Sequence, residues 1–180
     1  RKKTTRAITR LSKIVEKNCY NFSCHIDRKD VMWIVTSYSV KGYRTRDLKL
    51  IAQSPVQSYP IASFLLDGHQ LYISGYNGMQ LFDTDTRKWQ HLPAALQGLQ
   101  IPNDMVSGIH PYGEKGNLLL STTKHGLLYF NAQEGTILPQ SDKNFPFEVP
   151  DMQVNKMLTD SKGNLWLGSE DDGVKTLQIQ

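Results

Sequence analysis

The sequence predicts an all-β protein made of four repeats of one sheet unit, and three observations lead to this fold class. One motif occurs four times: a polar turn, a short apolar strand, a second turn, and a strand that follows a Gly. The large residues at the centres of the four apolar strands are 39, 47 and 47 residues apart; they are Trp33, Tyr72, Leu119 and Trp166. Helical periodicity is absent after residue 17, which argues against helical repeats. A period of about 40 to 50 residues is typical of a β-propeller, in which each blade has about four antiparallel strands.

The fourth repeat shows the motif most clearly. It reads DSKGNLWLGS over residues 160–169, followed by DGV at 172–174. Gly and Asn in the first turn accept positive φ at little cost, so they predict a tight turn. The run Leu-Trp-Leu is continuous and apolar, which predicts a strand buried on both faces. We therefore expect Trp166, like Trp33 in the first repeat, to be buried between blades rather than to stack on a ligand.

The other repeats keep this pattern in weaker form. The third reads GNLLLST at 116–122, the second DGHQLYISG at 67–75, and the first DRKDVMWIVT at 27–36, where Lys-Asp replaces the turn Gly. The strands that follow the later Gly are expected at 79–82, 127–130 and 174–177, and the short outer strands near 88–92 and 136–138. Connections that contain Pro then lead to the first strand of the next blade, expected at 61–66, 105–110 and 153–158.

The repeat divides the chain into two parts. Residues 1–19 form a basic N-terminal segment, and residues 20–180 form the four blades, with boundaries near 20–54, 55–97, 98–142 and 143–180. Residues 7–15 are a surplus segment of strand length, whereas the fourth repeat has only three strands. We favour a chain that is part of a larger propeller, although residues 7–15 also offer a closing strand.

An unpaired strand edge carries free N–H and C=O groups that tend to pair with another chain. We therefore expect the chain to self-associate in one of two ways. Either two half-rings complete a larger propeller as a homodimer, or residues 7–15 pair with the edge of residues 174–180.

At residues 160–174 the sequence resembles the two-component regulator propeller repeat. The usual form of that repeat is Asp, a turn residue and Gly, then a strand with Trp-Ile-Gly-Thr and a later Gly-Leu. The resemblance extends over about Tyr20 to Gln180 and is weakest in the first repeat. It implies the periplasmic or other extracytoplasmic sensor region of a hybrid two-component histidine kinase. Many sensors of this family respond to oligosaccharides, so the resemblance also implies an oligosaccharide ligand.

Charge and composition argue against several function classes. The net charge is +4, but residues 1–17 hold seven basic residues and one acidic residue, so the remainder is slightly acidic. A basic tail is weaker evidence than a basic face, and we expect no nucleic-acid binding. No apolar run approaches the roughly 20 residues needed to cross a bilayer, and we expect no membrane insertion by this segment. Cys19 and Cys24 give neither a disulfide framework nor a metal spacing, and Cys24 is expected to be buried.

Catalytic motifs are absent from the sequence. There is no Gly-rich phosphate loop, no His-Glu-x-x-His and no Gly-x-Ser-x-Gly, and the five histidines show no metal-ligand spacing. His125 with Glu170 is the nearest approach to a catalytic pair. Asp83 and Asp85 resemble the start of a calcium loop, but the Gly and distal Glu are missing, which favours a polar turn. We therefore expect no enzyme activity, no cofactor and no catalytic metal.

The candidate ligand-binding residues lie in the turns between the second and third strands of each blade. In a propeller these turns emerge at the same end as the connections between blades, and functional residues concentrate on such loops. They offer aromatic rings for sugar C–H surfaces, and amide and charged groups for hydroxyls. The candidates are Tyr38, Tyr76, Asn77, Lys124, His125, Glu170, Asp171 and Asp172.

Three functions are compared on this basis. The favoured one is a sensor segment that recognises an extracellular ligand or relays its binding to a kinase. The alternatives are a propeller scaffold for protein–protein contacts and, less favoured, a propeller enzyme similar to streptogramin lyases. The enzyme needs convergent His, Glu and metal ligands on one face, which the sequence does not provide.

Overall fold

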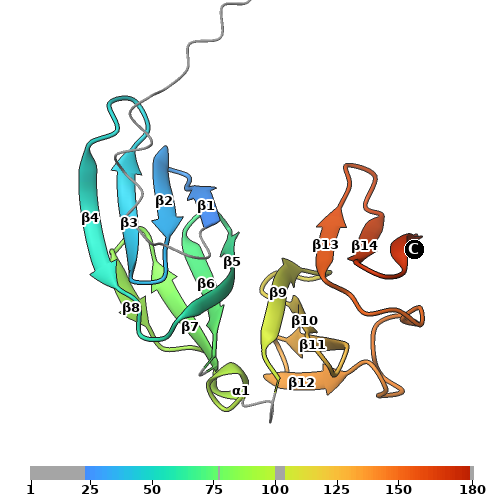
Figure 1. The fold of residues 1–180 in the computed structure, drawn as a ribbon. Coiled ribbons are helices and arrows are strands. Elements are labelled where there is room, and N and C mark those ends of the chain that lie inside the picture. The colour runs from blue at the N-terminus through green and yellow to red at the C-terminus, as the bar shows by residue number, and fades with distance from the viewer. Residues whose placement is uncertain (1–22, 77, 100–103, 179–180) are drawn as a thin grey trace, which may run out of the picture.

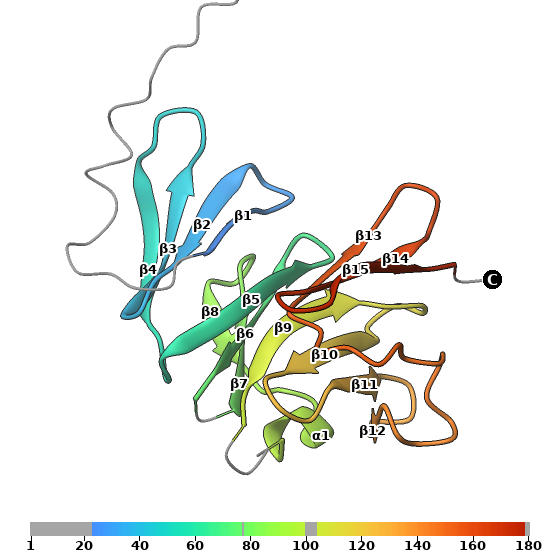
Figure 2. The same cartoon turned by 45° about the vertical axis from the view of Figure 1, so that its right-hand side comes forward.

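The computed structural model describes residues 23–76, 78–99 and 104–178, and these residues form four antiparallel sheets (Figures 1 and 2). Three sheets have four strands and the last has three, each with its strands side by side in chain order. The one helix among the described residues is the single-turn α1 (Ala94–Gln97), in the connection between the second and third sheets. The all-β class and the blade-like sheets predicted from the repeat are therefore confirmed.

The strands follow the repeat closely. The first blade contains β1 (Ser23–Ile26), β2 (Val31–Val35), β3 (Ser39–Arg44) and β4 (Leu50–Pro55). The second contains β5 (Pro60–Leu66), β6 (Gln70–Gly75), β7 (Gly78–Asp83) and β8 (Lys88–Gln90). The third contains β9 (Val106–Pro111), β10 (Leu118–Thr122), β11 (Leu127–Asn131) and β12 (Thr136–Pro139). The fourth contains β13 (Lys156–Thr159), β14 (Leu165–Ser169) and β15 (Gly173–Leu177).

The four central residues of the repeat occupy equivalent positions on the second strand of each blade. Trp33 packs in one buried cluster with Leu71 and Ile73 of the second blade. Tyr72 packs with Leu118 and Leu120 of the third blade, and Leu119 packs with Leu165 and Leu167 of the fourth. Each of these three central residues thus points forward onto two aliphatic residues of the blade that follows it, and this contact is the core of each junction.

Trp166 departs from the expected burial. Its side chain lies on the face of the fourth blade that points away from the third, and the residue is 39% exposed, against 0% for Trp33. Both indole N–H groups still bond the Asp that opens their repeat, Trp33 to Asp27 Oδ2 at 2.7 Å and Trp166 to Asp160 Oδ2 at 3.0 Å. The prediction that Trp166 is buried is therefore wrong, because its forward face meets no following blade in the described chain.

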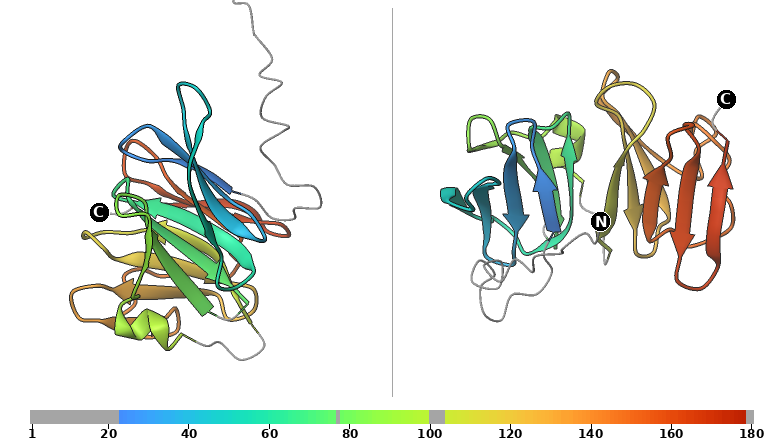
Figure 3. Two further views of the ribbon diagram at one scale, coloured as in Figure 1. Left: turned by 90° about the vertical axis from the view of Figure 1, so that its left-hand side faces the viewer. Right: turned by 90° about the horizontal axis from the view of Figure 1, so that it is seen from above.

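The blades follow one another along an open arc, with the first and fourth sheets at opposite ends (Figure 3, right). The inner strands β1, β5, β9 and β13 succeed one another along the inside of this arc. His25 Nε2 lies 2.7 Å from Ser63 Oγ, and His110 Nε2 lies 2.8 Å from Thr159 Oγ1, so polar contacts join inner strands of neighbouring blades. Cys24, expected to be buried, is exposed on β1. Residues 7–15 lie outside the described residues, and self-association stays a prediction.

Ion pairs join neighbouring blades at the end of the sheets that carries the turns between first and second strands. Asp85, in the turn after β7, pairs with Lys29 at 2.8 Å and with Arg28, both from the first blade. Hydrogen bonds from Lys29 and Arg28 lower the pKa of Asp85 to about 2. Asp67 of the second blade pairs with Lys115 of the third at 3.4 Å. The polar turn expected at Asp85 is therefore present. The Asp85 carboxylate also forms ion pairs with residues of the preceding blade.

Candidate ligand-binding loops

The candidate residues share one end of the sheets. In an antiparallel sheet with strands in chain order, the turn from second to third strand and the exit of the outer strand lie at the same end. Tyr38, Tyr76, Lys124 and His125 lie in such turns of the first three blades, and residues 170–172 lie in that of the fourth. Asn77, also a candidate, lies outside the described residues.

Three exposed tyrosines lie in loops at this end of the first two blades, and two of them, Tyr59 and Tyr76, are in ring contact. Tyr38 is 59% exposed and Tyr76 is 61% exposed. Tyr59, in the connection between β4 and β5, is 37% exposed, and its ring centroid lies 5.9 Å from that of Tyr76 with the ring planes at 52°. Tyr59 was not among the candidates, because connections between blades carry no repeat motif. The signal that identifies it is its place in a connection at the candidate end, directly before Pro60.

The loops that carry these tyrosines are fixed by polar side chains beneath them. The Thr36 hydroxyl accepts from the backbone N–H groups of Tyr38 and Ser39 at 3.3 and 3.1 Å, which closes the first turn. Val56 N–H donates to the Tyr38 carbonyl at 3.1 Å, which ties this turn to the connection that holds Tyr59. The aromatic rings are therefore exposed, while the backbone beneath them is bonded in place.

A buried amide secures the same connection from the second blade. Gln80 is 5% exposed, its Oε1 accepts from Gln57 N–H at 2.7 Å, and its Nε2 donates to the Ser58 carbonyl at 3.1 Å. Gly75 permits the close approach, because a Cβ there would lie 2.7 Å from the Tyr59 carbonyl oxygen. Burying an amide is costly unless it is hydrogen-bonded, so this arrangement holds the connection in one conformation.

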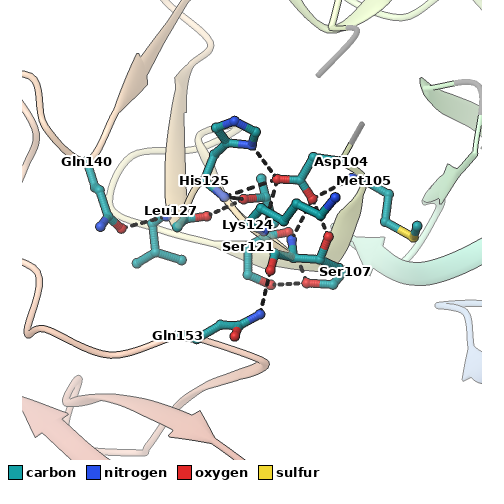
Figure 4. Close-up of polar contacts among 12 residues, drawn as sticks. Asp104, Met105, Ser107, Ser121, Lys124, His125, Leu127, Gln140 and Gln153 are labelled. Atoms are coloured by element: carbon teal, nitrogen blue, oxygen red, sulfur yellow. Dashed lines mark hydrogen bonds and ion pairs between the residues drawn. The ribbon is translucent and has the colours of Figure 1, made fainter. Parts of the chain in front are cut away.

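Asp104 organises the corresponding turn of the third blade (Figure 4). The side chain of this residue is fully covered. Its carboxylate accepts from the backbone N–H groups of Met105, Thr123, Lys124 and His125, at 2.7 to 3.0 Å, and from the Thr123 hydroxyl. Burial raises the pKa of Asp104, but the hydrogen bonds from Thr123, His125 and the backbone outweigh it and hold this pKa well below its ordinary value.

Asp104 also orients the imidazole of His125. The His125 Nδ1 lies 2.6 Å from Asp104 Oδ2. An ionised carboxylate only accepts hydrogen bonds, so Nδ1 carries the proton and the exposed ring presents Nε2 to solvent. His125 and Glu170 are the nearest approach to a catalytic pair in the sequence, but within the described residues no hydrogen bond or ion pair joins them. Sequence reasoning missed Asp104, which lies about twenty residues before the turn that it holds.

A shallow hollow of about 540 Å³ adjoins His125. It is lined by Thr123, Lys124, His125, Gly126, Gln140, Met152 and Gln153. Two of the lining amides are already engaged: Gln140 Oε1 accepts from Leu127 N–H at 2.7 Å, and Gln153 Nε2 donates to the Thr123 carbonyl at 2.5 Å. Each of these exposed glutamines keeps its other amide group open to a ligand, as do the His125 ring and the exposed Lys124 side chain.

The acidic turn of the fourth blade stands apart from this hollow. Glu170, Asp171 and Asp172 are exposed, and none lines the hollow at His125. The Ser169 hydroxyl accepts from the N–H groups of Asp171 and Asp172 at 3.3 and 3.2 Å, which is the bonding of an ordinary tight turn. The described residues hold no group of three His, Cys, Asp or Glu side chains placed to bind a metal ion.

A larger hollow of about 870 Å³ lies elsewhere, beside β15. This hollow is lined by residues 146–151, Tyr112, Leu177 and Gln178. Among the described residues, β15 pairs only with β14, so the hollow borders the open edge of the fourth sheet. Its position there makes it the space beside an unpaired strand rather than a built ligand site.

Comparisons with known proteins agree with the repeat. The sequence model described as two component regulator propeller matches residues 148–171. This match lies in the fourth blade and includes β13 and β14 but not β15, and it falls on the repeat where the resemblance in the sequence is closest. The part of the fourth blade that this model matches is thus similar to the two-component regulator propeller repeat, and the four sheets have the architecture of propeller blades.

Solved structures with a similar fold include extracellular sensor domains. The extracellular domain of the hybrid two component system BT4673 from B. thetaiotaomicron superposes with a TM-score of 0.62 at 16% identity, over 87% of this chain and 21% of that one. That of BT3049 from the same organism gives 0.59 at 17% identity, over 87% and 23%. Hydrazine synthase from Kuenenia stuttgartiensis gives 0.58 at 13% identity, over 87% and 45%.

These structures share the fold of the chain, and the similarity supports no conclusion beyond the fold. Extracellular domains of two-component systems and an enzyme both occur among them. The chain spans about a fifth of the two extracellular domains. Among curated proteins, none matches the sequence. Within the described residues, no helix has the length and apolar character needed to span a membrane.

Proposed function

We propose that the chain is a segment of an extracytoplasmic sensor propeller of a hybrid two-component system, and that its loop end takes part in recognising an oligosaccharide. The observation that carries this proposal is the group of exposed tyrosines at the first junction, Tyr38, Tyr59 and Tyr76. The repeat match and the similarity to extracellular domains of hybrid two-component systems support the sensor assignment.

The chemistry of the tyrosines suits a hydroxyl-rich ligand. A tyrosine ring offers an apolar face to the C–H groups of a sugar, while its phenol hydroxyl bonds ring hydroxyls. Exposed aromatic side chains on fixed loops cost little ordering entropy on binding, because few side-chain torsions remain to be frozen. Tyr38 and Tyr76 are more than half exposed on hydrogen-bonded turns, so they meet this description.

His125 and Lys124 extend the same end of the molecule along the arc to the third blade. The His125 ring is held by Asp104 and offers Nε2 as an acceptor or, when protonated, as a donor. A ligand long enough to reach from the second blade to the third would contact both the tyrosines and this region. The acidic turn at residues 170–172 lies one blade further on and belongs to the same proposed surface.

The experiment is a glycan panel screened by isothermal titration calorimetry on the whole chain. For a glycan that binds, we expect Tyr38→Ala and Tyr76→Ala each to raise Kd about twofold to tenfold, because an aromatic contact contributes about 0.5 to 1.5 kcal/mol. Leu50→Ala is the matched control, since Leu50 is 44% exposed on the outer strand β4, away from these loops. If all three variants bind with equal affinity, the ligand does not contact Tyr38 and Tyr76. If no glycan of the panel binds, the proposal of an oligosaccharide ligand is contradicted.

A further inference from the structure

The outer strand of the second blade is shorter than the strand it pairs with. β8 pairs with residues 81–83 of β7, whereas β7 begins at Gly78. In the first and third blades the outer strand reaches the first or second residue of its partner strand. β8 therefore leaves the outer edge of residues 78–80 without a described strand beside it. A hollow of about 210 Å³ lies at this edge, and Met79, Gln80 and Leu81 are among the residues that line it.

Two connections between blades border this hollow. Gln57 comes from the connection before β5, whereas Gln97 comes from the connection that contains α1. Leu96 of α1 is fully buried and packs in one cluster with Met79 and Leu81, so α1 is held against β7. Both connections lie at the end of the sheets that carries the candidate loops, and the hollow therefore opens at that end.

The polar side chains that line the hollow are mostly amides: Gln57, Gln80, Gln90 and Gln97, together with His91. An amide offers both donors and an acceptor, and a sugar hydroxyl likewise donates and accepts. Gln97 Nε2 donates to the Leu92 carbonyl at 2.6 Å, so its Oε1 is left to accept from a ligand. Gln57 and Gln90 are exposed, and the backbone beneath Gln57 is fixed by the buried Gln80 amide. The hollow thus presents amides on a bonded support.

The charge of the hollow limits the ligands that suit it. Among the described residues that line it, none is acidic and none is Lys or Arg. A carboxylate or sulfate group desolvated there would lack a cationic partner, which is costly, whereas a hydroxyl can bond an amide. The volume is below the roughly 300 to 1,000 Å³ of pockets for drug-sized ligands, so the hollow suits one small unit.

We propose that this hollow binds one neutral sugar unit, a hexose without carboxylate or sulfate, as a subsite of the oligosaccharide. The inference rests on the proposed function and adds a position and a charge class for the ligand. Tyr76 lies two residues before β7, and Tyr59 lies two residues after Gln57, so the tyrosine pair is close in the chain to both sides of the hollow. We expect the neighbouring unit of the same glycan to contact that pair.

The first experiment is NMR on the whole chain labelled with ¹⁵N at glutamine. Methyl glycosides of glucose, galactose and mannose are titrated, each beside its uronic acid, in which a carboxylate replaces the CH₂OH group. We expect at least one neutral glycoside to shift the side-chain NH₂ signals of the lining glutamines, and its uronic acid to bind at least about tenfold more weakly. Gln53 and Gln133 are exposed outside the hollow, so their signals should not move.

Two substitutions test the amides directly. Gln57→Ala keeps the bond to Gln80, because the donor is the main-chain N–H of residue 57, and Gln90→Ala changes an exposed side chain at the end of β8. We expect each variant to raise the Kd of the neutral glycoside about twofold to tenfold, the effect of one lost hydrogen bond. Gln53→Ala, on the outer strand β4, is the matched control and should leave Kd unchanged.

Three results would overturn the inference: no shift of the lining glutamines with any neutral glycoside, equal affinity for a uronic acid, or an unchanged Kd in both Gln57→Ala and Gln90→Ala. The proposed function is judged separately. A panel glycan that loses affinity in Tyr76→Ala but not in the two glutamine variants would uphold the proposed function and contradict this subsite. Binding of a neutral glycoside at the glutamines, without any panel binder, would support the hollow as a neutral sugar site and contradict the oligosaccharide.

Discussion

Asp104 shows how one carboxylate fixes a loop that carries candidate binding residues. Its covered side chain accepts from three successive backbone N–H groups, those of Thr123, Lys124 and His125, and also from the Thr123 hydroxyl and the His125 ring. Hydrogen bonds to a charged acceptor are stronger than those between neutral groups, so the turn depends on the charge as well as the shape of this residue. The presentation of His125 to a ligand follows from that anchorage.

We expect Asp104→Asn to lower the free energy of unfolding by about 1 to 3 kcal/mol, because the amide keeps one acceptor and turns its other group toward N–H donors. Urea unfolding at neutral pH measures the loss, and Asp172→Asn in the exposed turn of the fourth blade is the control, expected to stay within about 0.5 kcal/mol. Because the folded pKa of Asp104 is depressed, its contribution is complete above about pH 4 and is lost as the pH falls further. The difference between Asp104 and Asp104→Asn should therefore shrink in acid; a constant difference from pH 7 to pH 3 would contradict the charge-based account.

At the scale of single residues, the sequence predicted which turn each candidate residue occupies, but not which side chains hold that turn in place. The turns that hold Tyr38, Tyr76 and His125 were located because they follow a repeated strand at a fixed distance. Asp104 and Tyr59 lie in connections between blades, whose lengths differ and which carry no repeat. Their roles depend on which loops meet at the end of the sheets, and that information appears only once the sheets are assembled.

At the scale of the blade, the second strand is the element that decides stability, since its two faces serve two different junctions. We expect Trp33→Ala to cost about 3 to 5 kcal/mol, because it removes a fully buried indole and leaves the buried Asp27 without that donor. Trp166→Ala should cost less than about 1.5 kcal/mol, because its face is open to solvent. Urea melts of the two variants compare them directly, and equal losses would mean that Trp166 is covered in solution.

Gly42 tests the packing of the same element from the neighbouring strand. It lies opposite Trp33 on β3, and a Cβ at this position would come within 2.9 Å of the indole ring. We expect Gly42→Ala to destabilise the chain by about 1 to 3 kcal/mol, the usual cost of overpacking a filled core. Gly168→Ala is the matched control, because Gly168 occupies the forward face of β14 and its nearest new contact is an ordinary 3.7 Å to Lys156. A neutral Gly42→Ala in thermal melts would show that the indole can move aside.

The strands were predictable because turn residues and apolar runs are local signals. β5, β9 and β12 begin within one residue of the expected positions, whereas β13 begins at Lys156 rather than at Gln153. The residues before β13 belong to a long connection whose Met152 and Val154 pack into the third junction. The burial of Trp166 was mispredicted for a related reason. An apolar residue in a strand indicates a face suited to packing, but the local sequence does not show whether another sheet covers that face.

At the scale of the whole molecule, the arc is joined on three levels: aliphatic and aromatic clusters in the middle of the sheets, ion pairs at one end, and histidine contacts between inner strands. The ion pairs at Asp85 and Asp67 are partly exposed, so salt screens them and they add little at physiological ionic strength. The inner strands lie where the blades come closest, and a charge created there cannot be screened as readily. The histidines are therefore the groups through which pH acts on the arc as a whole.

Burial lowers the pKa of both His25 and His110, each of which contacts a hydroxyl of the following blade, on Ser63 and Thr159 respectively. An unfolded histidine takes up a proton near pH 6.5, whereas the folded chain binds it only at lower pH. The unfolded state thus binds more protons in this window, so stability is complete above about pH 6.5 and falls as the pH decreases below it.

We expect the Tm of the chain to drop between pH 7.5 and pH 5, and the drop to shrink in the double variant His25→Gln, His110→Gln, because a neutral amide can meet the same hydroxyls without titrating. Differential scanning calorimetry at matched ionic strength measures both, and the exposed His91→Gln is the control that should keep the full pH dependence. Separate single variants then assign the effect to the first or the third junction. If the double variant shows the same drop in Tm, other groups cause the pH dependence. That result would contradict the account in which protonation of these two histidines loosens the arc where its blades meet.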